Sequence, residues 1–570
     1  MIQKMTAYAW ILLSGEREGF LQSLQELGVV DITRSSKPVD EESARLVDSI
    51  EDTKALIKTL KSGSDAHLEA LKASRAAILG RMEEVAPWGE WDAEAMDALG
   101  VPFHFHCLRA KDFDPGWAER CALEVIYEGE GKVYFVVAGD NAGVGGEVPR
   151  PEATARALKA RSDALGAEAD AYAAALEARR AEIPALEQGI AQTSSALSLH
   201  LAGVTGESAA EGSIVVYRGF APSESDADLA AAFDAMDLYW TSREASADDN
   251  PPINFRNNRF VRMFEPLTDM YGRPAYDGFD PTPYISIFFL LFFAMCMGDM
   301  GYGIVLIIAG VLLRKVRSFA SLAPLVCTLG VGTVAVGFFF HTFFSVDIAS
   351  WEWIPEGVKA VFVPSTVAGY DGTMVLALAV GVVHLLLAMI VKTVYATRNA
   401  GFLESLSTWG WTLFWVGLTV IGVLALCGVL SSPIVRIAII VLGIVCAIGI
   451  FPLNNIHRNP LVNVGSGLWD TYNMATGILG DVLSYLRLYA LGLAGAMLGF
   501  AFNDLAAMAL GDGGLGWVFF ILIVIIGHTL NLAMAALGAF VHPLRLNFLE
   551  FFKNSDYQGV GRKYDPLRKQ

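Results

Sequence analysis

The stretch that decides the fold is residues 480–499, which read GDVLSYLRLYALGLAGAMLG. This apolar run is typical of a membrane helix, yet one arginine, Arg487, lies well inside it. An arginine at membrane depth costs at least about 2.5 kcal/mol to insert, so it needs a partner or water. The stretch therefore indicates a membrane helix with a charged working residue. The alternatives are that Arg487 reaches back to the interface or pairs within its own bundle.

Similar apolar runs fill the second half of the chain. They cover about 284–313, 321–345, 373–395, 405–430, 433–453, 470–503 and 515–548. Most are long enough to cross about 30 Å of hydrocarbon. Most charged residues lie in the first half, and the whole chain combines a net charge of −18 with 54% hydrophobic residues. We therefore expect a cytoplasmic part at 1–280 and a membrane part at 281–570.

The loop charges predict the side of the membrane on which each loop lies. Basic residues follow the first, third, fifth and seventh runs: Arg314, Lys315 and Arg317, then Lys392 and Arg398, then His457 and Arg458, then Arg562, Lys563, Arg568 and Lys569. The positive-inside rule places these loops in the cytoplasm. No signal peptide is recognisable before the polar half, so we expect both termini in the cytoplasm of a cell membrane.

Both termini are cytoplasmic only if the first apolar run forms a hairpin. Its centre holds Gly298, Asp299, Gly301 and Gly303, and glycines permit a tight turn. Such a break is tolerated when it is packed within protein. Asp299 is expected to satisfy the hairpin backbone rather than to bind an ion. The predicted membrane part is therefore all-helical and polytopic, with about eight helices that include this short broken hairpin and two long C-terminal helices.

Residues 1–280 predict α+β lobes joined by two long helices. Strand-like runs lie at 5–13, 28–32, 103–108, 123–129, 132–139 and 213–220, and helical patterns cover about 38–80 and 151–203. Apolar residues in both helices follow heptad spacing, with a bend expected at Pro184. An antiparallel coiled coil with a lobe at each end explains this order. A plain soluble bundle is the alternative.

Several kinds of chemistry are not indicated. No GxxxxGK[ST] loop is present, so no nucleotide site of that type is visible. The six cysteines are scattered without CxxC pairs, and His104 and His106 fit the alternation of a strand better than a metal site. The acidity of the chain argues against nucleic acid as a partner. We expect no cofactor and no metal.

The residues around Arg487 suit a moving partner helix. Ser484 shares the face of Arg487 by helical spacing, and small residues follow at Gly492, Ala494, Gly495, Ala496 and Gly499. Small residues let another helix approach closely. A fixed positive charge beside a smooth face suits a helix that carries a carboxylate. Asp481 lies about 120° away around the helix and is a weaker candidate for lining water.

The last apolar run carries a second polar pattern. His528, Asn531, His542 and Arg545 fall on one stripe together with Ala535 and Gly538. Such a stripe is a natural wall for an aqueous half-channel. Arg545 is nearer the cytoplasmic end, where a side chain can also snorkel to the interface. His542 is either a proton relay, since histidine titrates near neutral pH, or a packed polar residue.

At these residues the chain resembles subunit a of eukaryotic V-ATPases and subunit I of archaeal and bacterial V/A-ATPases. The resemblance rests mainly on PPINFRNNRFVRMFEPLTDMYGRPAYDGFDPTP (251–283), FFAMCMGDMGYG (292–303), GDVLSYLRLYALGLA (480–494) and HPLRLNFLEFF (542–552). Lean loops favour the bacterial or archaeal type.

The resemblance implies a non-ATP-binding stator subunit of a rotary ATPase. Its membrane part would lie beside a rotating ring of proteolipid c or K subunits, and two half-channels for H⁺ or Na⁺ would meet at Arg487. Arg545 would be a second channel arginine. The cytoplasmic arm would bind peripheral stalk subunits and the central-stalk cap subunit. A glutamate that eukaryotic relatives carry ten residues before the second arginine is Ala535 here, so the details of the proton path do not carry over.

The rival class is a secondary transporter or channel with a cytoplasmic coiled-coil domain. It predicts an internal repeat and a complete substrate site near the midplane. The apolar runs show no such repeat. Arg487 has no obvious acidic partner at matching depth in its own chain, which favours a partner on another subunit.

Overall fold

The computed structural model describes residues 1–34, 37–141, 143–209, 212–236, 238–316, 319–352, 354–367, 369–452, 459–510 and 514–569. Three of the basic loop residues used for the predicted orientation, Arg317, His457 and Arg458, lie outside these ranges. The chain forms two compact units. One contains residues 1–11 and 218–566, and the other contains residues 12–217 and 567–570. The predicted boundary between cytoplasmic and membrane parts near residue 280 therefore falls inside the first unit and stays a prediction.

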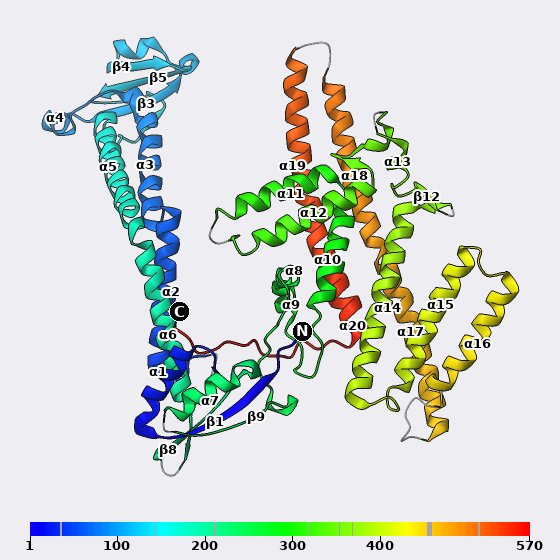
Figure 1. Cartoon of the computed structure of the whole chain (residues 1–570). Coiled ribbons are helices and arrows are strands. Elements are labelled where there is room, and N and C mark those ends of the chain that lie inside the picture. Colours follow the sequence, from blue (N-terminus) through cyan, green and yellow to red (C-terminus); the bar gives the residue numbers. More distant parts are fainter. Residues whose placement is uncertain are drawn as a thin grey trace. The chain divides into compact units, whose positions relative to one another are not determined.

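The unit of residues 12–217 contains four long helices in two pairs. They are α2 (Glu41–Ser62), α3 (Ala66–Val85), α5 (Ala155–Arg179) and α6 (Ile183–Val204). Helix α3 packs against α5 and α2 against α6, so the outgoing and returning chain lie side by side (Figure 1). Leu60, Leu68, Leu71, Ala169 and Leu176 form a buried apolar cluster between them. The coiled coil itself stays a prediction.

Local signals explain where these helices begin and end. Asp40 caps α2, accepting a hydrogen bond from the Ser43 N–H at 2.8 Å, and Gly63 ends it at φ +68°. Asp65 caps α3 in the same way, so the single helix expected at 38–80 is two. The returning segment is interrupted at residues 180–182, next to Pro184.

The same unit holds a four-stranded antiparallel sheet in the order β4-β5-β3-β6. Its strands are β3 (Phe103–Arg109), β4 (Ala122–Gly129), β5 (Lys132–Ala138) and β6 (Glu147–Val148). His106 is buried and stacks on Phe135. The remaining elements are α1 (Arg17–Leu27), β2 (Asp31–Ile32), α4 (Ala93–Ala98) and β7 (Glu207–Ala209).

The other unit begins with a small α+β portion. Strand β1 (Met5–Leu13) pairs antiparallel with β9 (Tyr239–Glu244), with Trp10 opposite Trp240. Strands β1 and β8 (Ile214–Pro222) each contain residues of both units. Helices α7 (Asp226–Asp234), α8 (Arg259–Arg262) and α9 (Glu265–Tyr271) complete this portion.

The rest of this unit is an apolar helical bundle. Its helices are α10 (Thr282–Met297), α11 (Met300–Leu313), α12 (Ala323–Phe339), α14 (Gly372–Ala400), α15 (Leu406–Leu426), α16 (Ser432–Ile450), α17 (Pro460–Ser484), α18 (Leu486–Ala509) and α19 (Gly514–Arg545). The chain then passes through a π-helical segment, η11 (Leu546–Phe551), into α20 (Phe552–Ser555). Short elements in the loops are β10 (Thr342–Phe343), β11 (Val346–Asp347), α13 (Glu356–Lys359), β12 (Thr366–Val367) and β13 (Tyr370–Asp371).

Five stretches of the described chain are long and apolar enough to cross a membrane. They are Gly372–Ala400, Leu406–Leu426, Ser432–Ile450, Leu461–Ala509 and Gly516–Ser555. The helices α10, α11 and α12 are apolar but shorter. The chain therefore has the composition of a polytopic membrane protein. The expected total of about eight membrane helices stays a prediction.

The helices break at the glycine-rich stretch where the hairpin turn is expected, and the expected hairpin stays a prediction. Helix α10 ends at Gly298, whose φ of +56° suits glycine, and Asp299 caps α11. Helix α11 then packs along α12, with Gly303 against Gly330 and Val334, and Gly310 against Cys327. Helix α10 instead packs against α12, α18 and α19. The antiparallel reversal therefore lies between α11 and α12, because their glycines allow the two backbones to approach closely.

Candidate functional site

Arg487 lies at the junction of α17 and α18. The two helices are separated by Tyr485 alone, which is fully buried and bonds to His384 Nδ1 through its hydroxyl at 2.9 Å. Arg487 is half-buried, and its Nη2 donates to Ser484 Oγ at 3.3 Å. Its Nη1 is buried without a hydrogen-bond partner among the described residues. The guanidinium is therefore held on one side and unsatisfied on the other.

A carboxylate of the same chain lies one side chain away. Glu550 in η11 is 5% exposed, and its Oε1 accepts the Ser484 hydroxyl at 2.5 Å. Ser484 therefore links Arg487 to Glu550. Among the described residues no ion pair joins Arg487 to a carboxylate, and Glu550 lies one hydrogen bond beyond Ser484. Glu550 is not among the residues predicted from the sequence, although an acid inside the apolar run LNFLEFF (546–552) is a visible signal.

Asp481, one helical turn before Ser484, forms a hydrogen bond and an ion pair. Its carboxylate accepts from Asn554 Nδ2 at 2.8 Å and pairs with Lys553 Nζ at 3.2 Å, both on α20. The Asp481 side chain is 14% exposed, whereas that of Lys553 is 62% exposed. We define the arginine site as Asp481, Ser484, Arg487 and Glu550. These polar side chains form a row between α17–α18 and the segment η11–α20.

The end of α19 approaches the arginine site. His542 is half-buried, its Nδ1 has no partner among the described residues, and the charges of Arg487 and Arg545 both act on its ring. Arg545 is exposed and forms no ion pair within the described ranges. Pro543 lies inside the helix, and Asn547 Nδ2 donates to the Pro543 carbonyl at 2.9 Å. The π-helical segment that follows is typical of functional sites.

The glycine-rich break after α10 forms a second polar cluster. The Asp299 carboxylate is 3% exposed and accepts four backbone N–H groups, from Gly301, Tyr302, Phe344 and Ser345, at 2.6–3.2 Å. It therefore joins the start of α11 to the loop after α12. Gly301 lies against the Phe344 ring, and Gly303 lies against α12.

His528 and Asn531 on α19 belong to this second cluster. The Tyr302 hydroxyl bonds to His528 Nδ1 at 2.7 Å and accepts from Asn531 Nδ2 at 2.8 Å. His528 Nε2 bonds to Asn503 Oδ1 at 2.9 Å, and Asn531 also donates to the Gly495 carbonyl. We define the hairpin cluster as Asp299, Tyr302, Asn503, His528 and Asn531. Tyr302 and Asn503 were missed from the sequence because their contacts with α19 join positions far apart in the chain.

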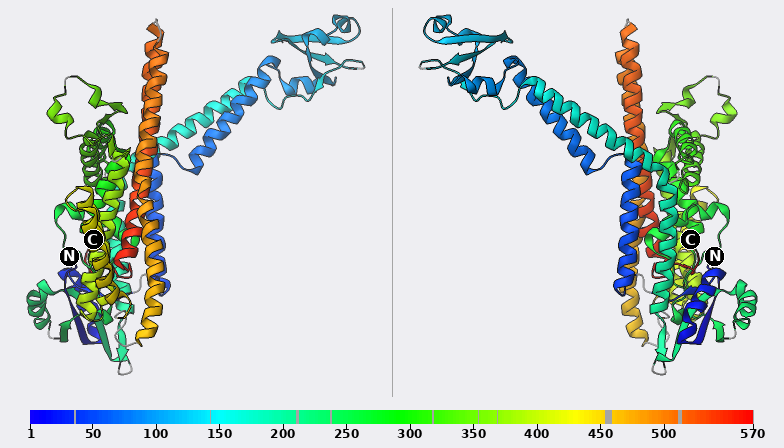
Figure 2. Two further views of the ribbon diagram at one scale, coloured as in Figure 1. Left: turned by 90° about the vertical axis from the view of Figure 1, so that its right-hand side faces the viewer. Right: turned by 90° about the vertical axis from the view of Figure 1, so that its left-hand side faces the viewer.

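The predicted small-residue face of α18 is divided in the structure. Gly492 and Gly499 face the bundle, since added side chains would meet the Met295 carbonyl and Ser345. Gly495 has open space beside it, and Ala490 and Ala494 are exposed. Leu483 and Met497 are also exposed, at 53% and 61%. An outward apolar face therefore runs along α17–α18 past Arg487, and α19 lies beside α18 (Figure 2).

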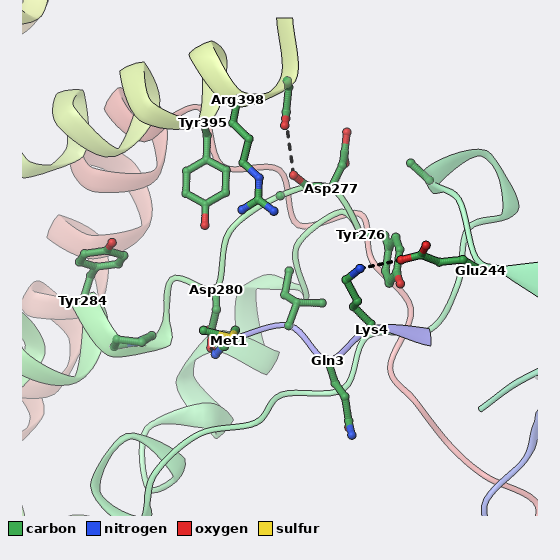
Figure 3. Close-up of a pocket in the computed structure, with 15 residues that line it drawn as sticks. Met1, Gln3, Lys4, Glu244, Tyr276, Asp277, Asp280, Tyr284, Tyr395 and Arg398 are labelled. Atoms are coloured by element: carbon green, nitrogen blue, oxygen red, sulfur yellow. Dashed lines mark hydrogen bonds and ion pairs between the residues drawn. The ribbon is translucent and has the colours of Figure 1, made fainter. Parts of the chain in front are cut away.

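The bundle also borders a wide cavity of about 890 Å³ at the end of α14 (Figure 3). Its lining includes Lys4, Glu244, Asp280, Tyr395 and Arg398. Lys4 pairs with Glu244 at 2.7 Å, which raises the pKa of Lys4 and lowers that of Glu244. The charges in this cavity are mixed, so it does not select a ligand of one sign.

Comparisons with known proteins agree on one family. The sequence model of the V-type ATPase 116kDa subunit family matches residues 207–320. The chain is 32% identical to the A-type ATP synthase subunit I of Pyrococcus abyssi, over 58% of this chain and 49% of that protein. It is 33% identical to the subunit I of Pyrococcus horikoshii, over 56% and 48%. The matched region thus spans about half the length of these relatives.

A bacterial relative matches over nearly its whole length. The V-type ATP synthase subunit I of Chlamydia pneumoniae is 24% identical over 99% of this chain and 97% of that protein. The fold and the site define a polytopic helical protein of the membrane with a charged site inside its bundle. In residues 207–320 the chain matches the V-type ATPase 116kDa subunit family, and it is similar to V/A-type ATP synthase subunits I.

Proposed function

We propose that this chain is the ion-translocating stator subunit in the membrane sector of a V/A-type rotary ATPase. Arg487 is the stationary charge past which the carboxylates of a rotating proteolipid ring move. The chain itself binds no ATP, and it couples the movement of H⁺ or Na⁺ to ATP hydrolysis or synthesis in partner subunits. It resides in the cell membrane with both termini in the cytoplasm.

The observation that carries this proposal is the state of Arg487. Its guanidinium lies among apolar helices, yet its Nη1 has no partner among the described residues, and it borders an outward apolar face. A permanently charged group in such a place is stable only if another group or water completes its contacts. A carboxylate on a helix that packs against α18 supplies that contact.

The remaining assignments follow from the same arrangement. Ser484, Asp481, His542 and Arg545 surround Arg487 and contribute to one half-channel, on the side where α20 ends. His528 and Asn531 lie further along α19 and border the opposite half-channel. Residues 1–280 form the stator arm that binds the peripheral stalks and the central-stalk cap subunit.

Site-specific photo-crosslinking tests the proposed partner. A photoreactive phenylalanine analogue is placed at Ala494, which is exposed on α18, or at Val441, which is 54% exposed on α16. After irradiation of the assembled complex in membranes, we expect Ala494 to give an adduct with the proteolipid and Val441 to give none. The proposal fails if neither position, or both equally, forms that adduct.

A further inference from the structure

Two rows of polar side chains face each other beside Arg487. Asp481, Ser484 and Arg487 recur every third residue on one side, and Asn554 and Glu550 lie four residues apart on the other. Asn554 donates to Asp481 at 2.8 Å, Ser484 donates to Glu550 at 2.5 Å, and Arg487 donates to Ser484 at 3.3 Å. The two rows begin at the exposed Lys553 and end at the guanidinium of Arg487, whose Nη1 lacks a hydrogen-bond partner among the described residues.

Glu550 is the acidic residue in the middle of these two rows. It is 5% exposed, and its Oε2 is buried without a hydrogen-bond partner among the described residues. A buried oxygen without a hydrogen-bond partner is costly, so the site favours a further group that donates to Oε2. Ser484 can serve a carboxylate as a donor or a carboxylic acid as an acceptor, because its hydroxyl does both.

The geometry does not fit a fixed ion pair. An arginine and a carboxylate that serve only to neutralise each other favour a direct, two-pronged contact. Here Ser484 stands between them, and each keeps one buried atom unpaired: Nη1 of Arg487 and Oε2 of Glu550. The unpaired donor of Arg487 and the unpaired acceptor of Glu550, with Ser484 bonded to both residues, leave a place where a third group, itself a carboxyl, completes the contacts.

We propose that Glu550 is the proton-exchange carboxyl between the solvent at α20 and the ring carboxylate at Arg487. This inference rests on the proposed function. In one direction Glu550 takes a proton from water, then its O–H bond breaks as an O–H bond forms on the ring carboxylate, which releases that carboxyl from Arg487. In the other direction the same proton passes from the ring carboxyl to Glu550 and then to water.

Other charged and titratable groups face Glu550 from each element packed against it. Asp481, Tyr485 and Arg487 come from α17–α18, and Lys553 comes from α20. His384 on α14 stacks on Phe551, next to Glu550, and Tyr284 of α10 contacts the same ring.

The test compares two substitutions of Glu550 in the whole complex. Glu550→Gln keeps the size and an acceptor oxygen for Ser484 but cannot exchange a proton, whereas Glu550→Asp keeps the acid. ATP-driven H⁺ uptake is measured in vesicles that contain equal amounts of assembled complex. We expect Glu550→Gln to lower the uptake by about 100-fold or more and Glu550→Asp to retain a measurable fraction. Asp504→Asn, which removes an exposed acid from α18, is the matched control and keeps wild-type uptake.

Three outcomes overturn the inference. Wild-type uptake in Glu550→Gln makes the residue a simple hydrogen-bond acceptor, and loss in both Glu550 variants with intact assembly makes its role one of packing. Uptake of Na⁺ rather than H⁺ by wild-type vesicles removes the proton to be exchanged. In each case Arg487→Ala still tests the proposed function separately, since that function holds for either ion.

Discussion

The arginine site and the hairpin cluster are two polar regions in the same apolar bundle, and they differ in how well their hydrogen bonds are satisfied. In the hairpin cluster Asp299 accepts four backbone N–H groups, and both ring nitrogens of His528 have partners. At the arginine site Arg487 Nη1 and Glu550 Oε2 are buried without partners within the described part of the chain.

This difference in hydrogen bonding distinguishes a cluster that stabilises the fold from one that takes part in function. A polar network that is fully satisfied in an apolar environment holds its elements together, whereas unsatisfied buried groups need an explanation beyond stability. We interpret the hairpin cluster chiefly as a structural hydrogen-bond network that holds α11, α18, α19 and the loop after α12 together. We interpret the arginine site as a place completed by another group. Substitutions in the two regions should therefore affect different measurements.

Asp299→Ala has the largest expected effect on stability. It removes the acceptor of four buried N–H groups, and each such loss costs about 1–3 kcal/mol. We expect a loss of several kcal/mol, measured as a lower midpoint of thermal unfolding of the solubilised complex. Asp504→Asn is the control and leaves the midpoint unchanged. A stable Asp299→Ala variant that fails to pump would assign Asp299 to the ion path instead.

Tyr302→Phe has an intermediate expected effect. It removes a hydroxyl that serves both His528 and Asn531, which leaves one half-buried and one buried side chain short of a partner. We expect about 1–3 kcal/mol of destabilisation, with ATP-driven ion uptake per assembled complex unchanged. Uptake that falls much more than stability would contradict this expectation, because it would make the Tyr302 hydroxyl part of the half-channel rather than a support for the side chains that border it.

Lys553→Ala has the smallest expected effect. Its ammonium pairs with Asp481 at 3.2 Å, but the Lys553 side chain is 62% exposed, and Asn554 also holds Asp481. Exposed ion pairs contribute about 0–1 kcal/mol. We expect a change in unfolding free energy within that range and little change in uptake. A large loss of uptake would extend the functional part of the arginine site to its exposed end.

The sequence predicted much of the local structure because its signals are local. Strand β5 lies within one residue of its expected bounds, and the interruption beside Pro184 occurs. The division of the first long helix at Gly63 was missed, although the glycine and the capping residue Asp65 were both visible. The reversal between α11 and α12 depends on glycine contacts between distant segments, which one helix's pattern does not encode.

The same distinction applies to the site. Arg487 was identified from the sequence because a charge in an apolar run is costly wherever the helix packs. Glu550 was missed as its neighbour, because the contact with Ser484 joins residues 66 positions apart and depends on the π-helical turn of η11. His528 and Asn531 were expected to line water, and only the fold shows that Tyr302 and Asn503 already bind them.

The most direct test of the central claim is ATP-driven ion uptake by the Arg487→Ala complex, with H⁺ and Na⁺ measured separately. Arg436→Ala, which removes an exposed arginine from α16, is the control, and subunit content confirms equal assembly. The account predicts that the Arg487→Ala complex assembles but takes up neither ion, while the control transports as the wild type does. Coupled uptake by the Arg487→Ala complex would contradict it.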